Sequence, residues 1–354
     1  MGLLFSLPII MLAAIAIPSG LLADRIGIRK AAGIGAVIMV VGSLMRGTTT
    51  SFETLFAFTA LFGVGFALVY PNLPKLVGAW FPREQAGLVT GIYATAIMTA
   101  VSLSLAITLP VVFPITNTFR GTFYIWGILV IVATILWWII VREPPSSSIQ
   151  GQQVGEGNKS SSLVWKNRNL WLVAISLFLL NFHFYIWAGW TPALMMLKGA
   201  PPDLAALITS VMSWTTLPIA FLIPWASYKL GLRKPFFWAS TIILVFVSWG
   251  AIYASVPFFW LLMVVIGITL GGTFSMILAL PVEMVPQESV GMASGMVLSI
   301  GYIGGLVGPW IAGHILDTTG TLNLALVILI GVAIVWTVIA FLIPETSPRV
   351  KLRK

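Results

Sequence analysis

The side chains that could carry chemistry in this chain are few, and they lie mostly at the ends of apolar segments. Ten residues are acidic, and all of them fall in loops or near segment ends: Asp24, Glu53, Glu84, Glu143, Glu156, Asp203, Glu283, Glu288, Asp317 and Glu345. No apolar segment therefore offers paired carboxylates for acid–base catalysis or a carboxylate at mid-depth for proton transfer. Cysteine is absent, which excludes thiolate catalysis and thiolate metal sites. We expect no enzyme, no catalytic residue, no metal and no other cofactor.

His183 is the one ionisable side chain near the middle of an apolar segment. It lies in Asn169–Leu197, where Asn181 and Tyr185 share one helical stripe and Trp187 shares the adjacent stripe with His183. An imidazole titrates near neutral pH, so His183 could carry a proton or recognise a weakly anionic solute. Alternatively, it hydrogen-bonds a neighbouring helix and the aromatic residues pack. Both interpretations are open.

The composition indicates that these residues belong to a membrane protein. Hydrophobic residues make up 59% of the chain and charged residues only 8%, with a mean hydropathy of +1.03. Soluble domains carry about 25% charged residues. Eleven segments are long enough to span the roughly 30 Å of hydrocarbon in a bilayer. They are Met1–Leu22, Ala31–Met45, Phe52–Leu73, Ala86–Phe113, Thr122–Val141, Asn169–Leu197, Leu204–Tyr228, Phe236–Ala254, Phe258–Pro281, Ser289–Leu316 and Leu322–Ile343.

Basic residues divide unevenly between the two alternating sets of loops. Sixteen of the 19 lie in one set, and only Arg46, Arg120 and Lys198 lie in the other. The positive-inside rule places the larger set, with the carboxyl terminus, in the cytoplasm. We therefore expect a protein of the prokaryotic cytoplasmic (plasma) membrane, surrounded by lipid. The formal charge of +9 reflects this asymmetry and does not indicate nucleic-acid binding.

The two parts of the chain repeat each other at an offset of 204 residues. Gly27–Lys30 recurs as Gly231–Lys234, and Gly63 recurs as Gly267. The repeat predicts an all-α polytopic fold of two pseudo-symmetric bundles, with five and six visible spans. Asn169–Leu197 has no counterpart after Met1, so we expect that a first helix precedes this sequence. The expected regions are a bundle at 1–141, a cytoplasmic linker at 142–168, a bundle at 169–343 and a basic cytoplasmic tail at 344–354.

Three motifs carry a family resemblance. Gly20–Lys30 resembles the signature loop of the major facilitator superfamily: Gly, three residues, Asp, a basic residue, one residue, Gly and a basic cluster. The chain departs from that pattern only at Ile28. Trp80–Gly87 resembles the loop between helices four and five of the family, and Gly301–Gly313 its glycine-rich eleventh helix. The resemblance implies a secondary transporter that works by alternating access and lacks the first helix here.

The resemblance also implies that the signature loop is a gate. An aspartate beside basic residues can pair with a base or a helix end in one conformation and release it in the other. The alternative is an ordinary basic loop that only sets orientation. Tyr228 stands where Asp24 would recur, so we expect a weaker charged latch in the second half. The residues of the gating motif are Gly20, Asp24, Arg25, Gly27, Arg29, Lys30, Gly231, Arg233 and Lys234.

In this superfamily the first, fourth, seventh and tenth helices line a central cavity. The segments that correspond to the fourth, seventh and tenth helices here are Phe52–Leu73, Asn169–Leu197 and Phe258–Pro281. Aromatic and hydroxyl groups around one imidazole would suit a partly apolar or weakly anionic solute. The residues expected to line the cavity are Phe62, Phe66, Tyr70, Asn181, His183, Tyr185, Trp187, Thr269 and Thr273.

The cargo is the least determined property. The Asn72–Phe81 stretch and the glycine-rich helix resemble the nitrate and cyanate type of anion permeases. Nitrate members would place an arginine in Met1–Leu22 and another in Leu204–Ser227, and neither segment contains one. We therefore expect a small organic acid or neutral metabolite as substrate, a co-transported proton or ion, and a monomer. The alternative is a non-transporting membrane sensor or a truncated remnant of the family.

Overall fold

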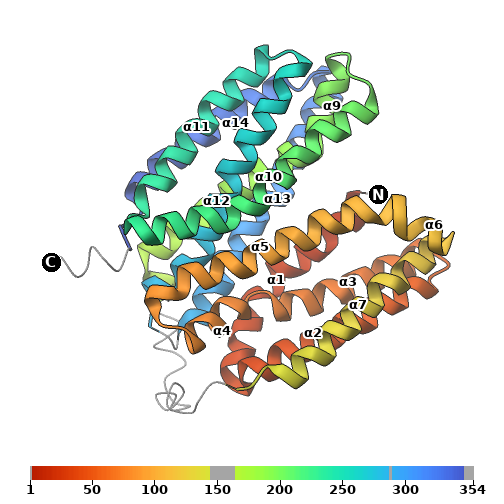
Figure 1. Ribbon diagram of the computed structural model, residues 1–354, viewed down its shortest axis with the longest axis vertical. Helices are drawn as coiled ribbons and strands as arrows, with labels where there is room; N and C mark the ends of the chain where they lie inside the picture. Colours follow the sequence, from red (N-terminus) through yellow and green to blue (C-terminus); the bar gives the residue numbers. More distant parts are fainter. Residues whose placement is uncertain (1, 144–163, 287–288, 347–354) are drawn as a thin grey trace. The chain divides into compact units, whose positions relative to one another are not determined.

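The computed structural model of the protein describes residues 2–143, 164–286 and 289–346. Every regular element in these ranges is helical (Figure 1). Ten of the described helical stretches are long and apolar enough to cross a membrane. The expected all-α polytopic fold is therefore confirmed.

The helices group into two compact units. Unit 1 contains the described residues of Met1–Phe81, Ala100–Asn167 and Val285–Tyr302, and unit 2 those of Pro82–Thr99, Arg168–Met284 and Ile303–Lys354. Helices α5 (Arg83–Ile107) and α13 (Val290–Thr319) are each divided between the two units. The expected division at 142–168 stays a prediction, because residues 144–163 lie outside the described part.

Unit 1 is built on four long helices. They are α1 (Gly2–Ile26), α2 (Ile28–Thr48), α3 (Phe52–Val69) and α7 (Phe119–Ile140). Helix α2 packs against α3 and α7, while α1 packs against α3. At the α2–α3 contact, a Cβ on Gly42 would lie 2.6 Å from the backbone nitrogen of Phe62. Glycine therefore allows the two backbones to approach closely, as small residues do between membrane helices.

Unit 2 contains the six helices of the second repeat, although the first part of α13 lies in unit 1. The remaining five are α9 (Arg168–Leu197), α10 (Pro202–Leu230), α11 (Lys234–Tyr253), α12 (Phe259–Met284, after the 3₁₀ turn η3, Val256–Phe258) and α14 (Asn323–Leu342). Helix α10 packs on α12, and α11 runs alongside α14 (Figure 1). Helix α9 contacts α10, α12 and α14.

Several helix boundaries differ from the expected segments, and those near the signature loop and Pro71 have a physical reason. Helix α1 extends to Ile26 and α2 begins at Ile28, because helical hydrogen bonds continue beyond the apolar stretch that hydropathy detects. The segment Phe52–Leu73 is interrupted after Val69, and α4 (Asn72–Trp80) follows Pro71, which has no N–H to donate.

The expected segment Ala86–Phe113 corresponds to α5, a π-helical turn η1 (Thr108–Val112) and the short α6 (Phe113–Thr116). Residues 287 and 288 lie outside the described ranges. The same holds for residues 347–354 of the expected basic tail.

Large apolar side chains cover the outer faces of several helices. Ile139 on α7 is 71% exposed, Phe246 on α11 is 66% exposed and Trp310 on α13 is 72% exposed. A soluble protein rarely leaves such side chains in contiguous contact with water. These faces suit the hydrocarbon of a bilayer, where apolar exposure is not penalised.

Candidate functional site

The signature loop turns sharply at Gly27, the residue between α1 and α2. Gly27 has a φ of +90°, which L-residues with a side chain rarely adopt. A Cβ at this position would lie 2.6 Å from the Oε1 atom of Glu143. The carboxylate of Glu143 therefore lies directly against the start of α2, where helix N–H groups attract negative charge.

Two side chains of the loop join it to other helices of unit 1. Asp24 forms an ion pair with Lys75 of α4. Arg29 donates a 2.8 Å hydrogen bond from Nη2 to the carbonyl oxygen of Trp138 on α7, and its guanidinium lies 5.5 Å from the Trp138 ring centroid. The other two basic residues of the motif, Arg25 and Lys30, are exposed. The loop thus contacts α4 and α7 through Asp24 and Arg29.

Helix α1 also crosses the first turns of α13 within unit 1. A Cβ on Gly20 would lie 2.6 Å from the Gly291 carbonyl oxygen, and one on Gly295 would lie 2.6 Å from the Ala16 carbonyl oxygen. The Lys75 side chain is part of this crossing, because a Cβ on Gly291 would lie 2.9 Å from its Cδ. The Asp24–Lys75 pair therefore lies beside a backbone-to-backbone helix contact.

The repeated loop in unit 2 uses different partners. Gly231 ends α10 in the left-handed conformation, with a φ of +69°. Arg233 pairs with Glu283 of α12, and the Thr346 hydroxyl donates a 2.7 Å hydrogen bond to Glu283 Oε2. Tyr228, at the place of Asp24, is exposed. The acidic partner in this half therefore comes from α12.

The carboxylate of Glu345 caps the start of α11 in unit 2. Its carboxylate accepts hydrogen bonds from the backbone N–H groups of Arg233, at 3.0 and 3.1 Å, and of Lys234, at 2.9 Å. Each repeat thus places a carboxylate from the segment after its last helix at the start of an earlier helix, since Glu143 follows α7 and Glu345 follows α14.

Phe62 and Phe66 of α3 and Tyr70 at its C-cap recur every four residues. Phe66 and Tyr70 stack with ring centroids 5.3 Å apart, as their four-residue spacing predicts. The series continues to Tyr302 of α13, whose hydroxyl donates to the Tyr70 hydroxyl over 3.3 Å. We call Phe62, Phe66, Tyr70 and Tyr302 the aromatic line; all four lie in unit 1.

His183 lies against α14. It is completely buried, with Nδ1 2.9 Å from the Leu179 carbonyl oxygen and Nε2 3.2 Å from the Leu329 carbonyl oxygen. Its ring centroid is 5.8 Å from that of Trp336. His183 therefore connects α9 to α14 through a main-chain carbonyl.

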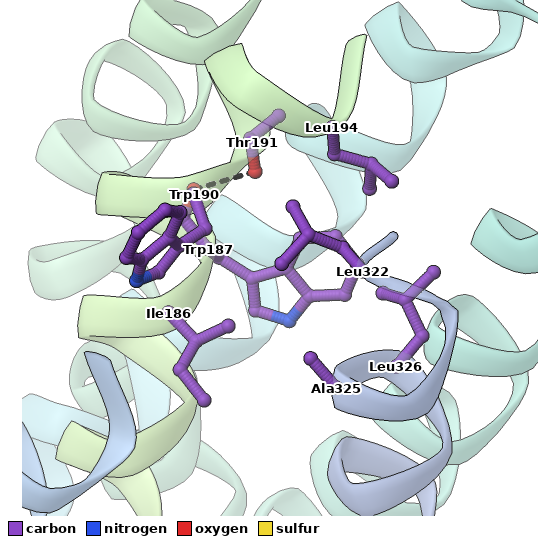
Figure 2. A pocket seen from close by; sticks show the side chains of 8 residues that line it. All are labelled: Ile186, Trp187, Trp190, Thr191, Leu194, Leu322, Ala325 and Leu326. Carbon is purple, nitrogen blue, oxygen red and sulfur yellow. Dashed lines mark hydrogen bonds between the residues drawn. The ribbon is translucent and has the colours of Figure 1, made fainter. Parts of the chain in front are cut away.

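Trp187 occupies the same face of α9, one turn further on. It lies in a narrow pocket where α9 meets the start of α14 (Figure 2). The pocket is lined by Ile186, Trp187, Trp190, Thr191, Leu194, Leu322, Ala325 and Leu326. The indole Nε1 of Trp187 is buried and has no hydrogen-bond partner there.

The remaining expected cavity residues are also buried or half-buried within unit 2. Asn181 is 3% exposed, and the Tyr185 ring packs at Gly305 of α13, where a Cβ would lie 2.6 Å from it. Thr269 and Thr273 are buried, and each hydroxyl donates to a carbonyl of its own helix α12. Of the nine expected residues, Phe66 and Tyr70 stack, and Phe62 lies one turn before Phe66 on α3. His183 and Trp187 share the face of α9 toward α14.

Sequence reasoning did not single out Lys75, Glu283, Glu345 or Tyr302 as site residues. Lys75 and Glu283 carry a usable signal, because both are charged residues close to the end of an apolar helix and such positions are costly without a partner. The identity of the partner depends on helix packing, which the spacing along the chain does not encode.

The helical fold and the apolar outer faces define a polytopic membrane protein. Among the described residues no group of three potential metal ligands occurs. A sequence profile described as Major Facilitator Superfamily matches residues 1–201 and 194–354. The chain belongs to the major facilitator superfamily, so it is a secondary transporter and not an enzyme.

Relatives of this chain are bacterial transporters. It is 27% identical over 336 residues to the uncharacterized transporter YycB of Bacillus subtilis (strain 168), covering 94% of this chain and 82% of YycB. It is 24% identical to the cyanate transport protein CynX of Escherichia coli (strain K12), covering 90% and 81%. It is 25% identical to the hexuronate transporter of B. subtilis (strain 168), covering 94% and 83%.

Solved structures show the same fold. The proton:xylose symporter XylE matches with a TM-score of 0.82 over 98% of this chain and 86% of that chain, at 16% identity. An identity this low supports the fold alone.

Proposed function

We propose that the protein carries a small organic acid across the membrane by alternating access. The observation that supports the mechanism is the Asp24–Lys75 pair beside the α1–α13 crossing. An ion pair at a helix crossing can hold one arrangement of helices and break in another, which is what a gate requires. A neutral metabolite remains the second substrate class within this proposal.

The acidic cargo is supported by charge and by the relatives. None of the described spans carries an acidic side chain at mid-depth that would neutralise a cationic solute. The names of two relatives, a hexuronate transporter and a cyanate transport protein, refer to anions. Co-transport of a proton would supply energy and compensate the negative charge of the cargo.

The proposed setting is the prokaryotic cytoplasmic membrane, with the carboxyl terminus inside. The uneven division of basic residues supports this orientation. A monomer is sufficient for the mechanism, because both repeats lie in one chain.

Uptake into liposomes tests the proposal. Purified protein would be reconstituted and supplied with labelled glucuronate, nicotinate, cyanate and the neutral amide nicotinamide, with and without an inward proton gradient. We expect saturable uptake of at least one acid that the proton gradient accelerates, while empty liposomes stay at background. Saturable uptake of nicotinamide alone would move the assignment to a neutral metabolite. No uptake of any solute would favour a sensor or a remnant of the family.

A further inference from the structure

Arg46 is held between three helices of unit 1. It lies in the last turn of α2, and its guanidinium carbon is 4.3 Å from the ring centroid of Phe62 on α3. The same carbon is 5.1 Å from the ring centroid of Phe123 on α7. The side chain is half-buried. Two aromatic rings thus fix the position of a guanidinium at the end of α2 opposite the signature loop, about 27 Å from Ile28 along the helix.

The charge of Arg46 has no acidic partner among the residues that the structure describes. Its nearest acceptor is the Ser43 hydroxyl at 3.5 Å, the limit of a hydrogen bond, and its buried Nε has no acceptor. A guanidinium stays charged at every physiological pH. A half-buried guanidinium with so few acceptors pays a desolvation cost, which a bound anion would offset.

Three other buried or half-buried cations among the described residues have polar partners. Lys75 pairs with Asp24, and Arg233 pairs with Glu283. Lys198 donates from Nζ to the carbonyl oxygens of Ile252 and Ala254, each at 3.0 Å, at the end of α11. Arg46 differs from these three because its main contacts are ring faces, which hold a guanidinium without accepting hydrogen bonds from its in-plane N–H donors.

The position of Arg46 relates it to the aromatic line. Phe62 touches Arg46 and begins the line, which continues through Phe66 to Tyr70, about 12 Å further along α3. The Tyr70 and Tyr302 hydroxyls lie at the far end of the line. The guanidinium, the rings and the hydroxyls along this line match a solute with a carboxylate at one end and a ring or hydroxylated body.

We propose that Arg46 binds the carboxylate of the transported acid, with Phe62 and Phe123 fixing the plane of its guanidinium. This inference rests on the proposed function and names the residue that selects an acid over a neutral solute. A planar guanidinium receives a carboxylate through two parallel hydrogen bonds, which a lysine at the same place does not reproduce. An anionic lipid headgroup offers similar oxygens, but the Arg46 side chain contacts rings of α3 and α7, whereas the Arg120 side chain of α7 is exposed.

The test compares an acid with its amide in three variants. Arg46→Gln removes the charge, whereas Arg46→Lys keeps the charge and removes only the planar guanidinium. Arg120→Gln is the matched control at an exposed arginine. Uptake of every acid that the wild type carries would be measured with that of its neutral amide, for example nicotinate and nicotinamide. We expect Arg46→Gln to raise the KM for the acid about 10- to 100-fold, Arg46→Lys to give an intermediate value, and Arg120→Gln to match the wild type.

Two further measurements keep the outcomes distinct. Liposomes with and without an anionic lipid separate substrate from headgroup: a loss of maximal rate that affects all solutes equally and follows the anionic lipid would overturn the assignment of Arg46. Phe62→Leu keeps the charge and loosens its support, so it should raise the KM for the acid about three-fold even if Arg46→Gln does not fold. An unchanged KM in both Arg46→Gln and Phe62→Leu contradicts this inference alone, whereas a wild type that carries no acid contradicts the proposed function as well.

Discussion

The two repeated loops each hold an ion pair, but they build it in opposite ways. In unit 1 the loop supplies the acid, Asp24, and a helix supplies the base, Lys75. In unit 2 the loop supplies the base, Arg233, and a helix supplies the acid, Glu283. The side chains of the first pair are 23% and 9% exposed, whereas both side chains of the second pair are 4% exposed.

This difference in burial separates two physical roles. A pair that is withdrawn from solvent loses much when one partner is removed, since the other charge stays buried without compensation. A partly hydrated pair can open at lower cost, because water replaces the lost contact. Glu283 also accepts from Thr346, and Glu345 closes the adjacent helix start, so the second pair belongs to a larger network. We infer that the pair in unit 2 holds its unit together and that the pair in unit 1 is the one that opens.

The largest expected effect follows from removing one member of the buried pair. Glu283→Ala leaves Arg233 buried without its partner, which should lower the free energy of unfolding by about 3–5 kcal/mol. The measurement is the thermal midpoint in detergent, together with the monodisperse fraction of purified protein. The double variant Arg233→Met with Glu283→Leu removes both charges and should recover most of the loss. If the Glu283→Ala protein is as stable as the wild type, the buried pair does not hold unit 2 together and the proposed difference between the two pairs fails.

Removing the acid of the pair in unit 1 should impair transport and largely spare stability. Asp24→Asn should reduce transport about ten-fold or more while the amount of folded protein in the membrane stays within about two-fold of the wild type. Asparagine keeps a side-chain oxygen that can accept a hydrogen bond from Lys75, and Asp24 is the more hydrated member of the pair, so folding should be largely spared. The exchange Asp24→Lys with Lys75→Asp restores opposite charges and should recover part of the rate. Normal transport by Asp24→Asn would reduce the loop to a topological signal.

The sequence predicted the features that depend on local patterns and missed those that depend on how the helices pack. Helical spans, the repeated loop and the turn at Gly27 depend on local patterns, and the structure has them close to the expected positions. The partners Lys75 and Glu283 depend on which helices cross, and Arg46 became informative only once its surroundings were known. The expectation of a weaker latch in the second half was inferred from Tyr228 alone, and it could not anticipate an acid supplied by α12.

His183 provides a smaller and more local test of unit 2. Because its two ring nitrogens face the carbonyl oxygens of Leu179 and Leu329, His183→Phe should lower stability by about 1 kcal/mol. The pH dependence of uptake should stay parallel to that of the wild type, as expected for a residue that joins α9 to α14. His183→Gln can keep one of the two contacts and should lie between the two proteins. A flattened profile between about pH 5 and 8 would instead show that the imidazole takes part in proton coupling.

The smallest expected effect on function comes from a test of sidedness, which the comparison of the two loops requires. Both pairs can act at one face of the membrane only if the two repeated loops lie on the same side. The chain has no cysteine, so single cysteines can be introduced at exposed positions without a background signal. Trp80→Cys and Leu232→Cys, near the first and second pair, should both be protected from an impermeant thiol reagent in intact cells and should react in inverted vesicles. Asn117→Cys and Thr318→Cys, at the opposite helix ends, should show the reverse, with transport close to wild type in all four. If Trp80→Cys and Leu232→Cys react from different sides, the loops are not equivalent and the comparison between the two ion pairs fails.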